Sequence, residues 1–444
     1  MTIKPYRYQQ DAIESMDARP GFILADDMGL GKTVTALAEI SQASYQPDNV
    51  LIVCPNSVKG VWATHAAEIL PEYPLLIMDS KNRGKTMTEW ESLPGGILVV
   101  NWDALRLIPT LNGYKWDYII ADEAHMMKNR KALRTKALKK MSAKHKRALS
   151  GTPMVNRPDE LWSILNWLYP KEFRSYWRFY KEFCDYKQHP QFGYYIFLGA
   201  KNMDELHELL KPFMIRRLKQ NVLKELPDKY YTHLEIEMDP LQARAYKQMK
   251  KDSLAILEPQ GDALAAPTVL AQLTRLRQFA CSYAEIADDG HVVMSDPSPK
   301  LDRLMEIIDD TDSPVVVFSQ FRQMVNLAAQ RLWATKVPYE MIHGEVSTSD
   351  RDKAVRSFQE GKARVFLATM QTGGVGITLT AASTVVFLDR SWSPAMNLQA
   401  EDRLHRIGQK NAVQVIALQS VGTVDKTVES KLELKWSWIK KIIG

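Results

Sequence analysis

Short apolar segments of strand length recur in both halves of this 444-residue chain, and they limit its possible folds more than any other feature. The segments are Gly21–Ala25, Val50–Cys54, Ile97–Val100, Asp117–Asp122, Val315–Phe318, Val365–Thr369, Val385–Asp389 and Val413–Leu418. Nearly continuous runs of Val, Ile and Leu are typical of strands buried on both faces, which occur in parallel sheets covered by helices. Because helix-like stretches separate the segments, the pattern predicts an α/β fold with parallel sheets.

The length of the chain predicts two domains, because 444 residues exceed what one compact core usually holds. The two sets of strands are separated by residues 160–300, which are rich in Trp, Tyr, Leu and Lys and are predicted to be mostly helical. The segment Leu226–Lys229 (LPDK) is one of the clearest turn signals there. We therefore place the boundary near Leu226, which gives domains 1–225 and 226–444.

Composition excludes several classes of protein. The three cysteines lie far apart and form no C-x-x-C pair, so neither a zinc site nor a disulfide framework is predicted. The N-terminal sequence lacks the apolar core of a signal peptide, and no apolar run approaches the ~18 residues of a spanning helix. We expect an intracellular protein with no membrane partner. The formal net charge of +6 permits a nucleic-acid partner without requiring one.

The segment 22–40 (FILADDMGLGKTVTALAEI) reads as a strand, a glycine loop and a helix. Gly29 and Gly31 allow backbone N–H groups to approach a polyphosphate closely. Lys32 would supply a charge for the β- and γ-phosphates and Thr33 a hydroxyl for Mg²⁺. The strict pattern has a small residue where this chain has Asp26, and the alternative is a simple glycine turn. The flanking strand and helix favour nucleotide binding.

Two adjacent carboxylates, Asp122 and Glu123, end the predicted strand of the sequence DYIIADEAH. The carboxyl ends of parallel strands face the ligand crevice of an open α/β sheet. Asp122 is predicted to hold Mg²⁺, mostly through water, and Glu123 to orient or deprotonate the attacking water. The alternative is a solvated acidic loop, which the upstream lysine loop makes less favoured.

Two arginines, Arg403 and Arg406, lie three positions apart in 399–410 (QAEDRLHRIGQK). On a helix they would share one face and point in the same direction. Such a pair suits a planar, highly charged anion. The alternative is a surface helix with weak ion pairs to Glu401 and Asp402.

Several motifs together resemble the SWI/SNF-type ATPases of helicase superfamily two, the motor class of chromatin remodellers and of recombination and fork-remodelling translocases. The matching stretches are 8–9 (YQ), 26–33 (DDMGLGKT), 51–58 (LIVCPNSV), 122–129 (DEAHMMKN), 149–170 (LSGTPMVNRPDELWSILNWLYP), 213–229 (FMIRRLKQNVLKELPDK), 315–321 (VVVFSQF), 342–361 (IHGEVSTSDRDKAVRSFQEG), 372–382 (TGGVGITLTAA) and 399–409 (QAEDRLHRIGQ). The segments 149–170 and 399–409 are highly specific for this class, whereas the lysine loop is shared by many nucleotide-binding proteins.

The resemblance implies two RecA-like lobes of the P-loop NTPase type. It also implies helical protrusions at about 171–212 and 240–300. The alternation of apolar and basic residues in 431–444 predicts an amphipathic C-terminal helix that braces the lobes. ATP would be the substrate and Mg²⁺ the cofactor, with Arg403 and Arg406 reaching the γ-phosphate from the second lobe. The implied nucleotide contacts are Gln9, Asp27, Met28, Gly29, Leu30, Gly31, Lys32, Thr33, Gly374 and Gly376, with Thr33 and Asp122 at the metal. Ser150 and Thr152 would couple the phosphate site to strand binding.

Family analogy also implies contacts to a tracked DNA strand. The residues are Pro55, Ser57, Asn101, Ser319, Gln320, Thr372 and Trp392, of which Trp392 could equally be packing. Short polar groups at loop tips bind phosphates without reading bases. The basic stretches 128–147 and 215–219 are further candidates, although charged runs are usually solvated faces.

Four positions depart from the family pattern. Asp27 stands in place of a common Glu, Thr378 and Ser393 in place of common Asn residues, and Gln371 in place of a residue that is often basic. None of these changes removes a predicted catalytic group. The last three affect the expected DNA contacts of the second lobe.

The favoured function is an ATP-dependent translocase that binds double-stranded DNA and tracks one strand, as a monomer when free. One alternative is a strand-separating fork helicase, or an RNA helicase given the DEAH tetrad. Another, from a different class, is an ATP-gated DNA clamp or scaffold with little turnover. No histone-reader module is recognisable, so we expect a minimal motor rather than a nucleosome remodeller.

Overall fold

The computed structural model describes residues 4–79, 81–190, 193–223, 225–257, 266–373 and 376–444. Its contacts divide the chain into two compact units, residues 1–224 with 435–444 (unit 1) and residues 225–434 (unit 2). Residues 435–444, assigned above to the second domain, thus belong to unit 1. Their apolar face explains this placement, because Ile439, Ile442 and Ile443 are buried in the core of unit 1.

Unit 1 is built on a seven-stranded parallel sheet with the order β3-β4-β2-β5-β6-β1-β9. Its strands are β1 (Gly21–Leu24), β2 (Asn49–Cys54), β3 (Leu75–Ile77), β4 (Gly96–Asn101), β5 (Trp116–Asp122), β6 (Ala143–Leu149) and β9 (Met214–Ile215). Its helices are α1 (Arg7–Asp17), α2 (Lys32–Gln42), α3 (Lys59–Ile69), α4 (Arg83–Ser92), α5 (Ala104–Leu107), α6 (Leu133–Lys140), α7 (Asp159–Leu168), α8 (Tyr176–Phe183), α9 (Met203–Leu210) and α10 (Lys219–Val222). The four apolar segments of the first half form β1, β2, β4 and β5, as predicted.

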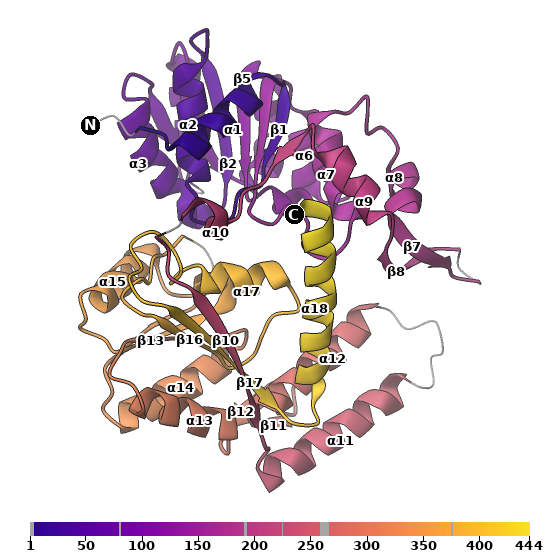
Figure 1. Cartoon of the computed structure of the whole chain (residues 1–444), viewed down its shortest axis with the longest axis vertical. Helices are drawn as coiled ribbons and strands as arrows, with labels where there is room; N and C mark the ends of the chain where they lie inside the picture. The colour runs from indigo at the N-terminus through magenta and orange to yellow at the C-terminus, as the bar shows by residue number, and fades with distance from the viewer. Residues whose placement is uncertain (1–3, 80, 191–192, 224, 258–265, 374–375) are drawn as a thin grey trace. The chain divides into compact units, whose positions relative to one another are not determined.

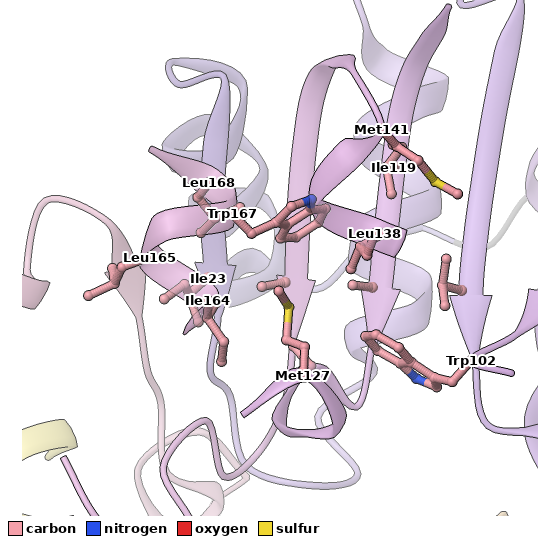
Figure 2. Packing of buried hydrophobic residues seen from close by; sticks show 14 of the residues in the cluster. Ile23, Trp102, Ile119, Met127, Leu138, Met141, Ile164, Leu165, Trp167 and Leu168 are labelled. Carbon is pink, nitrogen blue, oxygen red and sulfur yellow. The ribbon is translucent and has the colours of Figure 1, made fainter. Parts of the chain in front are cut away.

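Side chains of this sheet alternate between two cores. Leu24, Ile52 and Ile120 pack with residues of α1, α2 and α3 on one face of the sheet. Figure 1 shows these three helices beside the sheet. Ile23 and Ile119 pack on the other face against residues of α6 and α7, including Leu138 and Trp167, as Figure 2 shows. Both faces of each central strand are therefore buried, which is why these strands read as unbroken apolar runs.

Strand β6 was not predicted, because most of its sequence AKHKRAL lies in the basic stretch 128–147. Arg147 is fully buried, and its Nε donates to Glu39 Oε1 of α2 at 2.8 Å. Other cations of the stretch also have partners in unit 1: Lys139 donates to Asn166 Oδ1 at 2.8 Å and Lys146 to Trp167 O at 3.0 Å. These three cations thus have partners within unit 1, whereas Lys131, Lys136 and Lys140 are exposed, and contact of the stretch with a nucleic acid stays a prediction.

The segment 171–212 is less helical than predicted. Between α8 and α9 it contains an antiparallel hairpin of β7 (Cys184–Gln188) and β8 (Tyr195–Ala200). Aromatic residues dominate the contacts between the hairpin and α8, with Trp177 and Tyr195 ring centroids 5.1 Å apart. Aromatic side chains favour pleated, half-buried surfaces, which explains why this segment forms strands.

Unit 2 contains a six-stranded parallel sheet with the order β10-β17-β16-β13-β15-β14 (Figure 1). Its strands are β10 (Lys229–Ile236), β13 (Val315–Ser319), β14 (Tyr339–Ile342), β15 (Val365–Thr369), β16 (Thr384–Phe387) and β17 (Val413–Ser420), with β11 (Tyr283–Ile286) and β12 (Val292–Ser295) as a separate hairpin. Its helices are α11 (Pro240–Leu257), α12 (Ala266–Cys281), α13 (Pro299–Asp309), α14 (Arg322–Ala334), α15 (Thr348–Gln359), α16 (Met370–Gly373), α17 (Pro394–Glu401) and the first part of α18 (Val424–Ile443). The four apolar segments of the second half form β13, β15, β16 and β17.

The sheet of unit 2 is also covered on both faces. Val315 and Val317 point into a core with α13 and α14, whereas Val316 and Phe318 point into one with α15. The prediction of two parallel sheets covered by helices is therefore confirmed. In the part of the chain that is described, no helix combines the length and apolar character needed to span a bilayer.

Candidate nucleotide site and arginine turn

The loop between β1 and α2 has the backbone conformation that a phosphate-binding loop needs. Gly29 and Gly31 have φ angles of 84° and 75°, in the left-handed region that favours glycine. Gly31 is the N-cap of α2, so Lys32 and Thr33 lie in the first turn, as predicted. The unpaired N–H groups of that turn and the positive end of the helix dipole make it suitable for an anion.

The side chain of Lys32 folds back over this loop. Its ammonium group donates to the carbonyl oxygens of Asp26, at 2.7 Å, and Asp27, at 3.2 Å. Both acceptors are neutral backbone oxygens, so the positive charge of Lys32 is held at the loop without being cancelled there. A phosphate placed at the N-terminus of α2 would meet this charge.

The two aspartates before the loop are paired with two adjacent arginines. Arg217 Nε donates to Asp26 Oδ1 at 2.9 Å, and Asp26 is fully buried. Arg216 forms an ion pair with Asp27 at 3.2 Å and donates to the Gly151 carbonyl at 2.9 Å. From the sequence, Arg216 and Arg217 were only candidates for contact with nucleic-acid phosphates. Their pairing with the loop aspartates was not predicted. Asp26 departs from the strict loop pattern because its carboxylate anchors the loop to the segment after β9.

Tyr8 and Gln9 contact the same loop from α1. The Tyr8 hydroxyl and Gln9 Nε2 both donate to Leu30 O, at 3.0 Å and 3.1 Å. Gln9 Oε1 accepts from the Tyr6 N–H at 2.9 Å, and only 3% of Gln9 is exposed. In this structure Gln9 therefore holds the loop, and its predicted reading of adenine remains a prediction. A Cβ atom at Gly31 would lie 2.5 Å from Gln9 Nε2, so this position also requires glycine sterically.

The predicted contacts Met28 and Leu30 have buried side chains. Met28 packs against Gly151, where an added Cβ atom would lie 2.9 Å from Met28 Cγ. Only the backbone of Met28 and Leu30 is therefore placed to contact a nucleotide. The close approach explains the glycine at position 151.

Asp122 and Glu123 lie at the carboxyl end of β5, as predicted. Asp122 Oδ2 accepts from Trp62 Nε1 and Oδ1 from the Glu123 N–H, both at 2.9 Å. Burial, together with the nearby Glu123 carboxylate, raises the pKa of Asp122 to about 6, while Lys32 acts in the opposite direction. The charge of Lys32 is therefore felt at Asp122, which links the loop and the acidic pair into one site.

Glu123 adopts a left-handed backbone conformation with φ 49°. Its carboxylate lies 3.2 Å from His125 Nδ1, and that nitrogen is also 3.4 Å from Ser150 Oγ. Ser150 Oγ in turn accepts from the Thr152 N–H at 3.2 Å. A non-glycine residue in this conformation is uncommon and often marks a functional site. The predicted coupling residues Ser150 and Thr152 thus connect to Glu123 through His125.

The arrangement of Asp122 fits a magnesium ion. A half-buried carboxylate whose pKa is raised gains stability from a nearby cation. Mg²⁺ prefers carboxylate and hydroxyl oxygens and keeps several waters. The remaining lone pairs of Asp122 and the hydroxyl of Thr33 could supply such ligands.

In unit 2 the predicted arginine helix ends earlier than expected. Helix α17 stops at Glu401, and Arg403 and Arg406 lie in the following turn. The expectation of a shared helix face is therefore wrong. The side chains nevertheless converge, because Nη1 of both arginines donates to Ile377 O, at 3.2 Å and 3.1 Å. Arg403 is buried, and burial lowers the pKa of Arg406.

Thr378 replaces the asparagine common at its position and has a role in this turn. Its Oγ1 accepts from Arg406 Nη1 at 2.7 Å. Gly376 has a φ of 78°, which requires glycine, whereas Gly374 lies outside the described residues. Ile377 and Thr378 are thus in contact with the arginines, and the role of this loop in nucleotide binding stays a prediction.

The predicted strand contacts of unit 1 lie at the carboxyl ends of β2 and β4. Pro55 is half-buried and Ser57 exposed, so both are accessible. Asn101 is half-buried, and its Oδ1 caps the N-terminus of α5 by accepting from Ala104 N at 2.9 Å. The Asn101 amide nitrogen can still face a phosphate.

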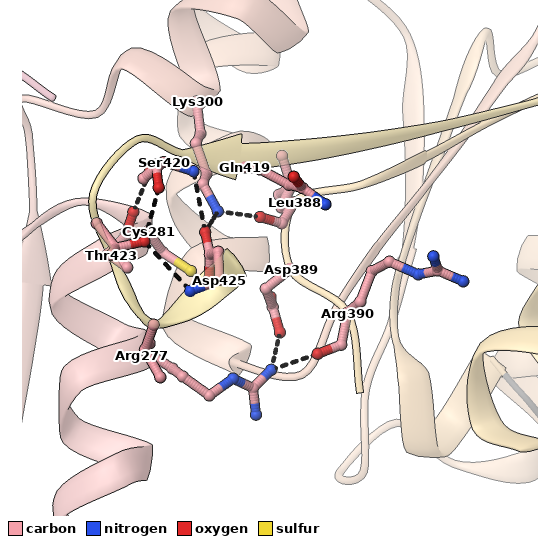
Figure 3. A network of polar contacts seen from close by, with 12 residues as sticks. Arg277, Cys281, Lys300, Leu388, Asp389, Arg390, Gln419, Ser420, Thr423 and Asp425 are labelled. Carbon is pink, nitrogen blue, oxygen red and sulfur yellow. Dashed lines mark hydrogen bonds and ion pairs between the residues drawn. The ribbon is translucent and has the colours of Figure 1, made fainter. Parts of the chain in front are cut away.

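The strand contacts predicted for unit 2 differ in accessibility. Ser319 is fully buried and its hydroxyl donates to Asp389, so its side chain cannot reach a DNA strand in this structure. Gln320 is half-buried, and its Oε1 accepts from Arg277 Nη1 at 3.3 Å. Arg277 also donates to Asp389 Oδ1 at 3.0 Å (Figure 3).

Thr372 and Trp392 are both half-buried. The hydroxyl of Thr369 donates to Thr372 Oγ1 at 3.0 Å. The Arg277 guanidinium lies 5.9 Å from the Trp392 ring centroid. Trp392 therefore has a packing partner, which supports the alternative of a packing role.

Comparison with known families gives two matches. Residues 8–285 match the SNF2-related domain, and residues 299–408 match the helicase conserved C-terminal domain. Together with the two parallel sheets, these matches identify the fold as two RecA-like lobes. The resemblance stated from the sequence is confirmed.

Several curated proteins are similar over nearly the whole chain. It is 32% identical to the mouse DNA annealing helicase and endonuclease ZRANB3, covering 96% of this chain and 40% of that protein. It is 30% identical to the ISWI chromatin-remodeling complex ATPase CHR17 of Arabidopsis thaliana, covering 91% and 39%. It is also 30% identical to a Mycoplasma genitalium protein named uncharacterized ATP-dependent helicase MG018, covering 98% and 42%. The chain spans about two fifths of the length of these relatives.

Among solved structures, the Sulfolobus solfataricus SWI2/SNF2 ATPase core in complex with dsDNA aligns with a TM-score of 0.47 and 29% identity. The alignment covers 100% of this chain and 95% of that one.

Proposed function

The chain belongs to the SNF2 family of helicase-like ATPases, and from that membership we propose that it is a motor that hydrolyses ATP on double-stranded DNA and moves along one strand. In this proposal residues 1–225 form the ATP-binding lobe and residues 226–434 the C-terminal lobe, and residues 435–444, at the end of the chain, pack in the core of unit 1. One observation carries the proposal. Unit 1 places Lys32 in the first turn of α2 and Asp122 at the carboxyl end of β5 in the same parallel sheet, and unit 2 directs Arg403 and Arg406 to one backbone carbonyl.

The residues of unit 1 suit the chemistry of phosphoryl transfer. Lys32 would bind the β- and γ-phosphates, and Thr33 and Asp122 would hold Mg²⁺, which neutralises the charge that develops on the phosphate oxygens. Glu123 would orient the attacking water and accept its proton. The 3.2 Å contact with His125 keeps the Glu123 side chain in one orientation.

Arg403 and Arg406 would complete the site when ATP draws the lobes together. Guanidinium groups that meet the γ-phosphoryl oxygens stabilise the transition state by about 10³–10⁵ in rate in nucleotide hydrolases. Loss of phosphate removes the contact that favoured closure, so the lobes reopen. If each lobe holds the same strand, one cycle moves the protein along it.

Accessible backbone and short polar groups support a sequence-independent grip on DNA. Pro55 and Ser57 lie at the tip of the loop after β2, and Asn101 lies at the end of neighbouring β4. Contacts of this kind bind phosphates and carry no base information. A motor that must cross any sequence needs such contacts.

The proposal is tested by measuring ATPase activity with duplex DNA, single-stranded DNA, forked DNA and RNA. Strong stimulation by duplex DNA is expected, together with displacement of a triplex-forming strand without fork unwinding. Stimulation by RNA alone would favour the RNA-helicase alternative. Negligible turnover with every ligand, combined with ATP-dependent DNA retention, would favour the clamp.

A variant of the acidic pair tests the assignment of the general base. Glu123→Gln should bind ATP and duplex DNA as the wild type does, yet hydrolyse ATP about 10²–10⁴-fold more slowly, the range typical of a lost general base. Binding is measured with a fluorescent nucleotide and labelled DNA. Hydrolysis at the wild-type rate would refute this role for Glu123.

A further inference from the structure

Arg390 connects two parts of unit 2. One is the loop after β13, where Gln320 is half-buried and is a predicted DNA contact; the other is the turn with Arg403 and Arg406. We propose that Arg390 is a positioning residue that couples contact with the DNA strand at the first part to the placement of the arginines at the second. This inference rests on the proposed function, because it concerns how DNA stimulates that same ATPase.

The backbone of Arg390 is tied to the β13 loop through a buried polar network. Arg277 Nη2 donates to Asp389 Oδ1 at 3.0 Å and to the carbonyl of Arg390 at 2.6 Å. The same carboxylate accepts from the Gln320 N–H at 3.2 Å and from the Ser319 hydroxyl. A displacement of the β13 loop would therefore be transmitted to residues 389 and 390.

The side chain of Arg390 extends away from this network, as Figure 3 shows. Its Nη1 donates to Glu429 of α18 at 3.0 Å, and its Nη2 lies 3.6 Å from Glu401 Oε1. One guanidinium group thus bridges two carboxylates on different helices. Its planar fork can hold both in fixed directions, which a lysine cannot do.

Glu401 is the point at which this bridge reaches the arginine turn. It is the last residue of α17, and its carbonyl accepts from the N–H groups of Leu404, at 3.1 Å, and His405, at 3.2 Å. Its carboxylate also accepts from the Lys229 ammonium at 3.0 Å and the Tyr231 hydroxyl at 2.9 Å. The side chain of Glu401 therefore fixes the start of the turn that orients Arg403 and Arg406.

The contacts of Arg390 with Glu401 and Glu429 have little access to solvent, so their geometry affects how strongly the charges interact. The side chain of Arg390 is 11% exposed and that of Glu401 is 2% exposed. Charged groups with so little solvent interact more strongly than exposed pairs and tolerate few alternative arrangements. Glu401 keeps Lys229 as a second cation, so loss of Arg390 would loosen the turn without leaving Glu401 unpaired.

Arg390→Met tests the proposal, since methionine keeps much of the side-chain length and removes the charge. The kcat and KM for ATP are measured with and without saturating duplex DNA. We expect the DNA stimulation of kcat to fall by about tenfold, within the range of measured coupling energies. Basal kcat, the KM for ATP and the Kd for duplex DNA should remain close to wild type, and Arg390→Lys should restore part of the stimulation.

Glu429→Gln is the matched control, because it removes the charge of the α18 partner and leaves the Arg390–Glu401 contact. Its stimulation should stay close to that of the wild type. Wild-type stimulation in Arg390→Met would overturn the proposal. An equal decrease in basal and stimulated rates would also overturn it, since that pattern indicates a merely structural residue. Absence of stimulation in the wild-type protein would instead be a failure of the proposed function.

Discussion

The phosphate loop of unit 1 and the arginine turn of unit 2 hold their charges in different ways. In unit 1 the carboxylates of Asp26 and Asp27 form ion pairs with Arg217 and Arg216. In unit 2 the guanidinium of Arg406 donates to two neutral oxygens, those of Ile377 and Thr378, and burial lowers its pKa against the opposing effect of Asp402.

This difference indicates a division of roles. A loop whose acidic groups are already paired keeps its shape before and after a ligand binds. A half-buried guanidinium whose hydrogen-bond acceptors are neutral is less favourably placed and gains free energy when an anion arrives. The paired phosphate loop therefore suits a binding site with a constant shape. The arginine turn suits a group that contacts the phosphate at only one stage of a catalytic cycle.

The largest expected effect tests the arginine side of this comparison. Arg406→Ala should lower kcat with duplex DNA by at least about 10³-fold, because the transition state loses a guanidinium. Lys32→Ala should abolish turnover as well. Steady-state phosphate release measures both, with circular dichroism as a control for folding. Unchanged turnover in the two variants would contradict the site.

The ion pairs of the phosphate loop in unit 1 are tested by Arg217→Met. This change leaves the fully buried Asp26 carboxylate without its Arg217 partner. Removing one member of a buried pair costs about 3–5 kcal/mol of folding free energy. We therefore expect a clear decrease in the unfolding temperature in a thermal scan. The double variant Asp26→Asn/Arg217→Met should recover part of the loss. A single variant as stable as the wild type would show that the pair is not what anchors the loop.

The raised pKa of Asp122 predicts a pH dependence. Since the folded-state pKa of about 6 lies above its ordinary value of 3.8, Asp122 becomes protonated as the pH falls through about 6. The neutral acid binds Mg²⁺ less well, so the Mg²⁺ concentration needed for half-maximal activity should rise by up to about tenfold per pH unit below 6. The linkage for folding has the opposite sign. Without Mg²⁺, this group lowers stability as the pH rises from about 4 to 6.

A Mg²⁺ requirement that stays constant between pH 7 and 5 would contradict this assignment. Titrations at fixed ionic strength separate the effect from general screening, because surface charges respond to salt. Asp122→Asn serves as the comparison variant, as it cannot titrate.

The smallest effect concerns the neutral partner of Arg406. Thr378→Val keeps the shape of the side chain and removes the acceptor of the 2.7 Å hydrogen bond. A hydrogen bond to a charged group contributes about 1.5–3 kcal/mol, so kcat should fall by about one order of magnitude or more. Thr378→Asn, the residue common in the family, should retain most of the activity. Full activity in the valine variant would show that Ile377 O alone holds Arg406.

The sequence was informative where burial dictates composition. All eight apolar segments became strands of the two sheets, because a strand covered on both faces has to be apolar along its length. The lysine loop and the acidic pair were also placed correctly, since both lie at strand ends. Strand β6 was not predicted from the sequence. Its cations Arg147 and Lys146 are compensated by Glu39 and by a backbone carbonyl, and only the tertiary structure reveals these partners.

Other failures have similar causes. The predicted helix through Arg403 ends at Glu401, where tighter turn hydrogen bonds such as Arg403 N–H to Ala400 O occur beside a helical one, although the arginine pair still converges. The burial of Ser319 depends on Asp389, which is distant in the sequence. The pairing of Arg216 and Arg217 with the loop aspartates also joins distant segments, and no local pattern signals it.

The buried contact between Arg147 and Glu39 has a consequence for how unit 1 assembles. These residues are 108 positions apart, and β6 lies between β5 and β1 in the sheet. A guanidinium cannot enter an apolar interior before its counter-charge is present, so β6 can insert only after α2 has docked. Refolding of unit 1 should therefore close the middle of its sheet late, after slow long-range contacts have formed.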